Sequence, residues 1–226
     1  MQNIFKKIKR GNFNFSKLQN LMIGVYLLLC IQFFFIFGLA FGLGIFGFLP
    51  ALITAFQLII PEYDAVKVIR INPIHFFWHN YFLNLKKYWL HSLLIFVVTF
   101  MLLNNIIFLE GQTSLFTLWL YYLTIIMLEI FCFMVVCFAY LSANYPKTSN
   151  KERIQNTLAY SLARLPEAIV FYVFLVAVLL VIYQIMTGLL VFCGIGLVIA
   201  SHYYFFKFLT QGGSFSKLGH YWRAHD

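Results

Sequence analysis

Charged residues are scarce in this sequence, and acidic residues are the scarcest of them. Only 10% of the 226 residues are charged, with seven Asp and Glu against sixteen Lys and Arg. Soluble domains have about 25% charged residues, whereas here 62% of the chain is hydrophobic and 20% is aromatic. One soluble domain cannot bury this much apolar surface. We therefore expect a membrane protein whose solvent is lipid.

Motifs for catalysis and metal binding are also lacking. The sequence has no Gly-rich phosphate loop, no nucleophile elbow and no pair of carboxylates for acid–base chemistry. Its four cysteines lack metal-site spacing, and buried thiols commonly act as small hydrophobic side chains. His75 and His79 have the i, i+4 spacing of paired zinc ligands, but the alternative is that both are polar anchors at the membrane interface. We expect no cofactor, no metal site, no enzymatic activity and no nucleic-acid partner.

Long apolar runs, by contrast, occur along most of the chain. A transmembrane helix needs about 20 apolar residues, and the run from Leu21 to Ile60 is long enough for two. We expect a single all-α membrane-embedded domain, residues 1–226, with six transmembrane helices and cytoplasmic amphipathic segments. The expected spans are about 21–40, 44–60, 90–109, 115–141, 167–183 and 189–209.

Glycine and proline interrupt the first apolar run. Gly42, Gly44, Gly47 and Pro50 lie within the stretch FGLGIFGFLPALITAF, residues 41–56. Both residue types are poor helix formers, but a turn can use the positive φ of glycine and the missing N–H of proline. We predict a hairpin turn between two helices at these four residues. The alternative is one strongly tilted and kinked helix.

The basic residues are confined to four segments. These are the N-terminal tail, residues 61–89, residues 144–165 and the C-terminal end from Lys207 onward. Lys and Arg accumulate in cytoplasmic loops, and six spans would place all four segments on one side. The opposite connections then hold Glu110 and no Lys or Arg. This pattern predicts a multi-pass membrane protein with cytoplasmic N- and C-termini.

An aromatic, basic amphipathic pattern precedes the third expected span, in PIHFFWHNYFLNLKKYW, residues 73–89. The apolar face has helical spacing and comprises Trp78, Tyr81, Phe82, Leu85, Tyr88 and Trp89. The opposite face comprises His75, His79, Asn80, Asn84, Lys86 and Lys87. Such a helix suits the headgroup plane, either as a simple lipid anchor or as a surface that also docks a partner. The candidate anchor or partner-interface residues are Trp78, Phe82, Lys86, Lys87 and Trp89.

Residues 151–165 repeat this amphipathic pattern more weakly. Their apolar side comprises Ile154, Leu158, Leu162 and Leu165. Pro166 and Glu167 follow, and proline followed by an acidic residue is typical of the first turn of a helix. We therefore expect the fifth span to begin here.

Glu129 is the one strongly polar ionisable residue deep within an expected span. It lies in LTIIMLEIFCFMVV, where a charge costs about 2.5–3.5 kcal/mol on insertion scales. We expect its side chain to face the interior of the helix bundle or a cavity. It could be a proton or cation site, or a hydrogen-bonding group toward a neighbouring subunit. The alternative is a protonated glutamate bonded to another helix of the same bundle.

The segments GIFGFLPALITAFQLI (44–59) and FFWHNYFLNLKKYW (76–89) resemble the YesL-like family of small bacterial membrane proteins. That family has a Gly-rich, Pro-Ala segment after the first span, as Gly47, Pro50 and Ala51 provide here. A short cytoplasmic aromatic and basic stretch follows before the next span. Members are often encoded beside carbohydrate ABC importers. The resemblance implies an accessory subunit in a bacterial plasma membrane whose partners are importer permease subunits. The amphipathic segment predicts membrane lipid as a further partner.

Three functional hypotheses follow. The first is the non-enzymatic accessory subunit of a carbohydrate ABC importer. The alternative is a stand-alone transporter or channel for ions or small molecules with Glu129 in its pathway. The third is a membrane enzyme, which the missing acid–base pair and metal cluster disfavour. Candidate groups for lining a pathway are Gln32, Thr124, Glu129, Gln184 and Thr187.

Overall fold

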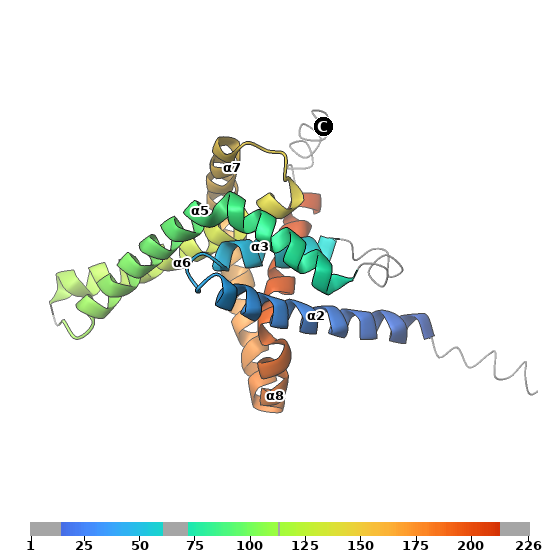
Figure 1. Ribbon diagram of the computed structural model, residues 1–226. Helices are drawn as coiled ribbons and strands as arrows, with labels where there is room; N and C mark the ends of the chain where they lie inside the picture. The colour runs from blue at the N-terminus through green and yellow to red at the C-terminus, as the bar shows by residue number, and fades with distance from the viewer. Residues whose placement is uncertain (1–14, 61–71, 113, 213–226) are drawn as a thin grey trace, which may run out of the picture.

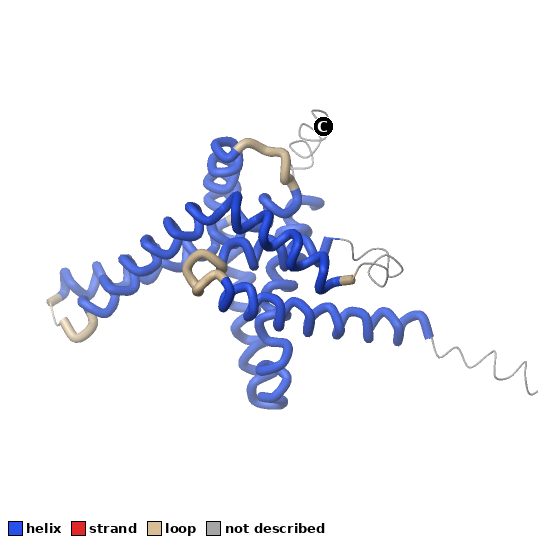
Figure 2. The backbone as a smooth tube through the Cα atoms, viewed as in Figure 1, coloured by secondary structure: helices blue, strands red, loops and turns tan. Residues whose placement is uncertain are grey.

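All regular elements in the computed structural model, which describes residues 15–60, 72–112 and 114–212, are helices (Figure 2). Five stretches are long and apolar enough to cross a membrane, and the architecture is that of an all-α, multi-pass membrane protein. These stretches are Met22–Phe41, Pro73–Leu109, Leu115–Asn144, Leu165–Gly188 and Leu190–Thr210. The α-helices are α2 (Phe15–Phe41), α3 (Phe48–Ile59), α5 (Pro73–Leu109), α6 (Leu115–Asn144), α7 (Asn150–Ala163) and α8 (Leu165–Gly212).

The helices form three hairpins that meet at a common core and project from it in different directions (Figure 1). In the first hairpin, α2 packs against α3. In the second, α5 packs against α6, and the side chain of Asn105 donates a 2.9 Å hydrogen bond to Thr124. The third is α8 itself, whose two halves bring Phe171 and Phe205 into a stack with ring centroids 4.2 Å apart. The backbone is non-helical at Met186, where α8 reverses.

Helix α3 differs from the span expected at 44–60. It has 12 residues, so it is about 18 Å long, against a hydrocarbon thickness of about 30 Å. Ten of those residues are buried, and α3 contacts α2, α5, α6 and α8. Hydropathy reflects only that this segment avoids water. It does not distinguish a helix surrounded by protein from one surrounded by lipid.

The first hairpin turns at residues 42–47. Leu43 has φ 53° and Gly44 has φ 73°, and both are in the left-handed region that glycine adopts most readily. Gly42 and Gly47 are in direct backbone contact, because a Cβ on Gly42 would overlap the Cα and N of Gly47. The chain therefore has two helices here and not one kinked helix. Pro50 lies outside the turn, in the first turn of α3, where its missing N–H removes no intrahelical hydrogen bond.

Local interactions define where the later helices begin. Serine side chains cap α6 and α7: Ser114 accepts from the backbone N–H of Thr117 and Ser149 from that of Glu152. Helix α8 begins at Leu165, and its first turn holds Glu167 in a 2.7 Å ion pair with Arg164. However, residues 73–89 and 90–109 form one continuous helix, α5. The expected spans 167–183 and 189–209 lie in the two halves of α8, which join at Met186 without a separate loop.

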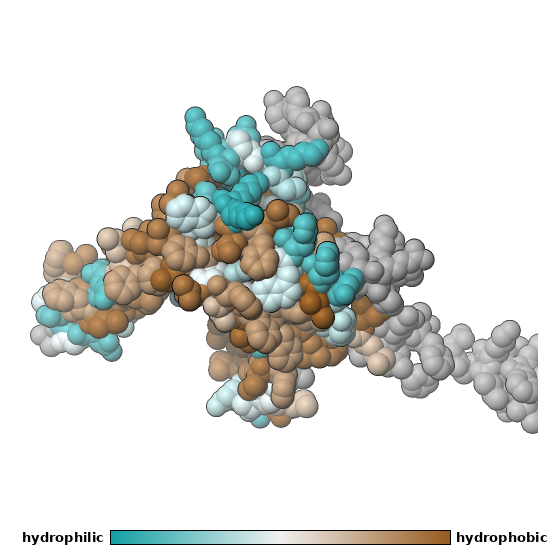
Figure 3. Space-filling model, in the orientation of Figure 1, coloured by the Kyte–Doolittle hydropathy of each residue, from teal (hydrophilic) through white to brown (hydrophobic). Residues whose placement is uncertain are grey.

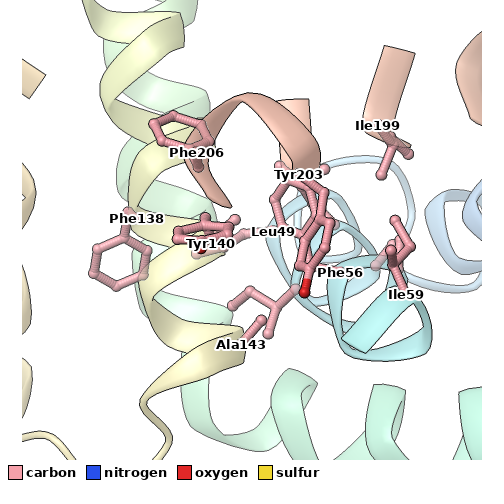
Figure 4. Packing of buried hydrophobic residues seen from close by; sticks show 14 of the residues in the cluster. Leu49, Phe56, Ile59, Phe138, Tyr140, Ala143, Ile199, Tyr203 and Phe206 are labelled. Carbon is pink, nitrogen blue, oxygen red and sulfur yellow. The ribbon is translucent and has the colours of Figure 1, made fainter. Parts of the chain in front are cut away.

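An aromatic cluster fills the point where the hairpins meet (Figure 4). Phe56 of α3 contacts Tyr140 of α6 and Tyr203 of α8, with ring centroids 6.2 and 6.1 Å apart. Phe206 stacks on Tyr140 at 5.2 Å and is fully buried. Aromatic side chains bury large areas and favour such offset or edge-on pairs. The cluster thus joins segments that are more than 140 residues apart along the chain.

Candidate functional site

Arg153 of α7 is almost completely buried, with 1% of its surface exposed. Its guanidinium donates to the hydroxyl of Tyr88 on α5 at 2.5 Å and to the carbonyls of Tyr145 and Thr148 at 3.1 and 2.9 Å. It also lies over the Tyr88 ring, 5.5 Å from the centroid. Burial lowers the pKa of the guanidinium. Arg153 therefore ties the α6–α7 loop to α5 through neutral oxygens.

Helix α7 buries several of its polar residues and exposes some of its apolar ones, unlike a helix on a soluble protein. Its polar residues Arg153, Thr157 and Ser161 are buried, whereas Ile154 and Leu158 are exposed. An apolar cavity of about 290 Å³, lined by residues of α5, α6 and α7, adjoins Ile154 and Leu158. Lys151, Glu152 and Gln155 are exposed too, so the exposed side of α7 carries both apolar and polar side chains.

The aromatic segment of α5 buries only part of its expected apolar face: Tyr81 and Tyr88 are buried, whereas Phe82 and Trp89 are exposed. The buried residues are Phe77, Tyr81, Asn84 and Tyr88. The candidate anchors surround this face: Phe82, Lys86, Lys87 and Trp89 are exposed, and Trp78 is half-buried. Among them, Lys87 donates a 3.1 Å hydrogen bond to the carbonyl of Pro146. The candidate anchor residues thus lie on the surface of the protein, beside the buried face of α5.

The placement of Asn84 on the outward polar face was wrong. Asn84 is buried and donates hydrogen bonds to the side chains of Thr54 and Gln57 of α3, at 2.9 and 3.0 Å. A small amide can be buried because these partners replace water. One turn earlier on the same face, the Tyr81 hydroxyl donates a 2.7 Å hydrogen bond to the carbonyl of Gly38. Two polar contacts therefore fix α5 on the first hairpin.

Gln32 joins α2 to the second half of α8. Its side-chain amide donates to the carbonyl of Val191 at 2.9 Å, and its carbonyl accepts from the backbone N–H groups of Ile195 and Gly196 at 2.8 and 3.1 Å. A Cβ on Gly196 would overlap the carbonyl oxygen of Leu28. Gln32 therefore satisfies backbone groups of a neighbouring helix at a close approach, which is a structural role.

The other candidate pathway residues are dispersed. Thr124 accepts a hydrogen bond from Asn105 between α5 and α6. Thr187 donates to the carbonyl of Tyr183 near the tip of α8, and Gln184 is exposed there. These groups and Gln32 lie in different hairpins and are not arranged along one route.

Glu129 does not face the bundle interior as expected. It is exposed on the surface of α6, and the described residues offer it no hydrogen bond or ion pair. Cys132 and Tyr172 lie within electrostatic range of its carboxylate. The interpretation of a glutamate bonded to another helix of the same bundle is therefore wrong. The side chain is directed toward whatever surrounds the described helices.

Among the described residues, no further metal-binding side chain joins His75 and His79. The rings of His75 and His79 are stacked with centroids 6.1 Å apart, and both side chains are exposed. Within the described ranges, no three His, Cys, Asp or Glu side chains form a group that could hold a metal ion. Cys30, Cys132, Cys137 and Cys193 are free thiols.

The geometry thus provides hydrogen-bonded contacts inside the core, exposed apolar side chains on α7, and an exposed glutamate in the middle of α6. The sequence pattern alone could not predict the core contacts or the packing of α7, because both depend on which helices pack against each other. Comparison with known protein families, with curated proteins and with solved structures found no match to this chain.

Proposed function

We propose that this chain is a non-enzymatic, partner-binding subunit of a bacterial membrane assembly, accessory to the permease of a carbohydrate ABC importer. The observation behind the partner-binding role is the small burial of the projecting helices. In the most apolar 18-residue stretch of α5, 11% of the residues are buried, and in that of the first half of α8, 6%. A self-sufficient bundle buries one face of each helix. Helices of a partner would cover these surfaces.

The choice of an importer permease depends on the resemblance of residues 44–59 and 76–89 to the YesL-like family. The packing agrees with an accessory role, because both segments contribute to the core. Tyr81 and Asn84 of the second segment contact Gly38 and Thr54 of the first hairpin. In this proposal the importer supplies the transport chemistry, and the chain described here supplies binding surface.

We further propose that the three hairpins are six membrane-embedded segments with one cytoplasmic side. Each hairpin would begin and end on that side. In the first hairpin, the short helix α3 would lead the chain back to the cytoplasmic side while surrounded by other helices of the protein. The described cations Lys86, Lys87, Lys147 and Lys151 lie away from the tips at Gly111 and Met186, and hydrophilic side chains gather around α7 (Figure 3). Cytoplasmic loops are enriched in such cations. Residues 1–14, 61–71 and 213–226, which include both terminal tails, lie outside the described residues.

The exposed apolar and aromatic residues beside these cations support contact with the lipid headgroup region. Phe82 and Trp89 of α5 and Ile154 and Leu158 of α7 are exposed close to lysines in sequence. Aromatic rings and lysine side chains are both favourable at that interface. Membrane lipid is therefore the second proposed partner.

The stand-alone transporter has weaker support. Gln32 and Thr124 are engaged in contacts between helices, and Gln184 and Thr187 lie near the tip of a separate hairpin. A transport route needs polar groups that face a common path. Glu129 alone remains as a candidate for such a role.

Gentle purification tests the proposed function. The tagged chain, expressed in its own host and extracted in a mild detergent, should retain permease subunits in near-equal amount to itself. An unrelated tagged multi-pass protein from the same membranes is the control. In parallel, the pure chain in liposomes should give no flux of ions or sugars. A chain that purifies alone, with flux that disappears in Glu129→Gln, would establish the transporter instead.

A further inference from the structure

Glu129 lies at the midpoint of α6. The helix runs from Leu115 to Asn144, so Glu129 is about 20 Å along the axis from either end. A glutamate side chain is too short to reach the headgroups from this depth, unlike the long side chains of lysine and arginine near helix ends. A carboxylate that is exposed here meets either hydrocarbon or another protein.

The hydroxyl of Tyr172, which is within electrostatic range of Glu129, already has a partner on α8. The Nδ1 of His202 lies 2.8 Å from the carbonyl of Val198, which can only accept, so Nδ1 bears the proton. The neutral ring then accepts at Nε2, 3.3 Å from the hydroxyl of Tyr172. The Tyr172 proton is therefore directed to His202, which is buried. It is not available to Glu129, although Tyr172 is within electrostatic range.

The surface of α6 beside Glu129 is apolar and uncovered. Ile126 and Tyr122, one and two turns before Glu129 on the same side, are exposed. The hairpin of α5 and α6 and the hairpin of α8 project from the core in different directions (Figure 1), and the Glu129 side chain is exposed as well. We call Tyr122, Ile126 and Glu129 the α6 face.

We propose that a transmembrane helix of a partner protein packs on the α6 face and that one of its basic side chains forms a hydrogen bond or an ion pair with Glu129. The basic side chain is a Lys or Arg that reaches mid-helix depth. The carboxyl group of Glu129 sets this chemistry, because ionisable side chains within membrane-spanning helices pair with one another. The inference rests on the proposed function and identifies the surface through which it acts.

A second copy of this chain does not fit the requirement. All of its Lys and Arg residues lie outside residues 90–140, the part of α5 and α6 that flanks Glu129. A twofold contact on the α6 face would place two carboxylates against each other. The partner is therefore a different chain.

Photo-crosslinking tests this inference. A photoreactive residue at Ile126 should give an adduct whose peptide is a partner transmembrane helix with a Lys or Arg within one turn of the attachment point. Glu129→Leu should reduce that adduct about tenfold, and Glu129→Gln should reduce it less, because glutamine still accepts a hydrogen bond. Met127 is the matched control, since it is equally deep and 56% exposed, against 52% for Ile126, but lies on the opposite side of α6 from Glu129. Its adducts should not respond to either substitution.

The possible outcomes distinguish a failure of the inference about Glu129 from a failure of the proposed function. An Ile126 adduct that is unchanged by Glu129→Leu, that contains a second copy of this chain, or that maps to a helix without a Lys or Arg would overturn the inference. The proposed function would survive that result if the permease still co-purified. A chain that retains no partner on purification would overturn the proposed function as well. Elution of each variant as a single monodisperse peak in size-exclusion chromatography confirms that it has folded.

Discussion

Gly42→Ala should destabilise the core by about 2–4 kcal/mol, because a methyl group has no space at the first hairpin. A Cβ at Gly42 would overlap the Cα and N of Gly47 and lie 2.9 Å from the Tyr81 hydroxyl oxygen. Two of these three atoms belong to the backbone, so a side-chain rotation cannot relieve the overlap. Helices α2 and α3 would have to separate, which would also weaken the Tyr81–Gly38 hydrogen bond.

Thermal unfolding in detergent, followed by tryptophan fluorescence, measures this effect. Gly24→Ala is the control, because no atom lies within 4 Å of the Cβ it would add and Gly24 is also in α2. The control should match the parent or be slightly more stable, since alanine favours helix. Equal melting temperatures for Gly42→Ala and Gly24→Ala would show that the two glycines at the turn are not in contact.

Arg153→Met should destabilise the protein by about 3–5 kcal/mol, because it leaves several buried acceptors without a donor. Methionine has a similar length but cannot donate to the Tyr145 and Thr148 carbonyls or to the Tyr88 hydroxyl. The stability of Arg153→Lys should lie between that of the parent protein and that of Arg153→Met, since one ammonium group cannot reproduce the planar fork of donors.

The control for Arg153 is Lys151→Met, which removes the same charge from the exposed face of the same helix. Limited proteolysis at residues 145–149 reports on the loop that Arg153 holds, and thermal unfolding reports on the whole domain. Arg153→Met should be cleaved faster at this loop and melt at a lower temperature than Lys151→Met. Indistinguishable behaviour of the two variants would contradict the assigned role of Arg153.

Much of the local structure was predictable from the residues. The glycines at 42–47 marked the first hairpin, because few other residues adopt positive φ in a tight turn. Ser114 and Ser149 begin helices by accepting from backbone N–H groups that have no partner inside the helix. Pro166 and Glu167 similarly fit the first turn of α8. These are interactions between neighbours in the sequence, so the sequence pattern contains them.

Packing between distant helices was not predictable in the same way. The expected apolar face of α5 included Tyr81 and Tyr88, which are buried, but also Phe82 and Trp89, which are exposed. Neighbouring helices decide which rings are buried: Phe77 stacks on Phe34 of α2, and Tyr88 contacts Phe138 of α6. Gln32 illustrates the same limit, because its partners are more than 150 residues away.

Glu129 was identified from its type and depth, but its direction was expected to be inward. An intramembrane charge usually faces the bundle interior. The hairpins diverge instead of closing into a bundle. No bundle interior therefore forms around this part of α6, and the Glu129 side chain is exposed. A partner helix would restore it.

Accessibility of the hairpin ends to an impermeant thiol reagent tests the central claim most directly. Single cysteines replace Gln112, Thr187 and Lys147 in a variant without the native cysteines, and intact cells are labelled before and after permeabilisation. Cysteines at 112 and 187, near the two long tips, should react in intact cells, whereas a cysteine at 147 should react only after permeabilisation. Reaction of 112 and 187 from opposite sides of the membrane, or labelling of 147 in intact cells, would contradict hairpins that share one cytoplasmic side.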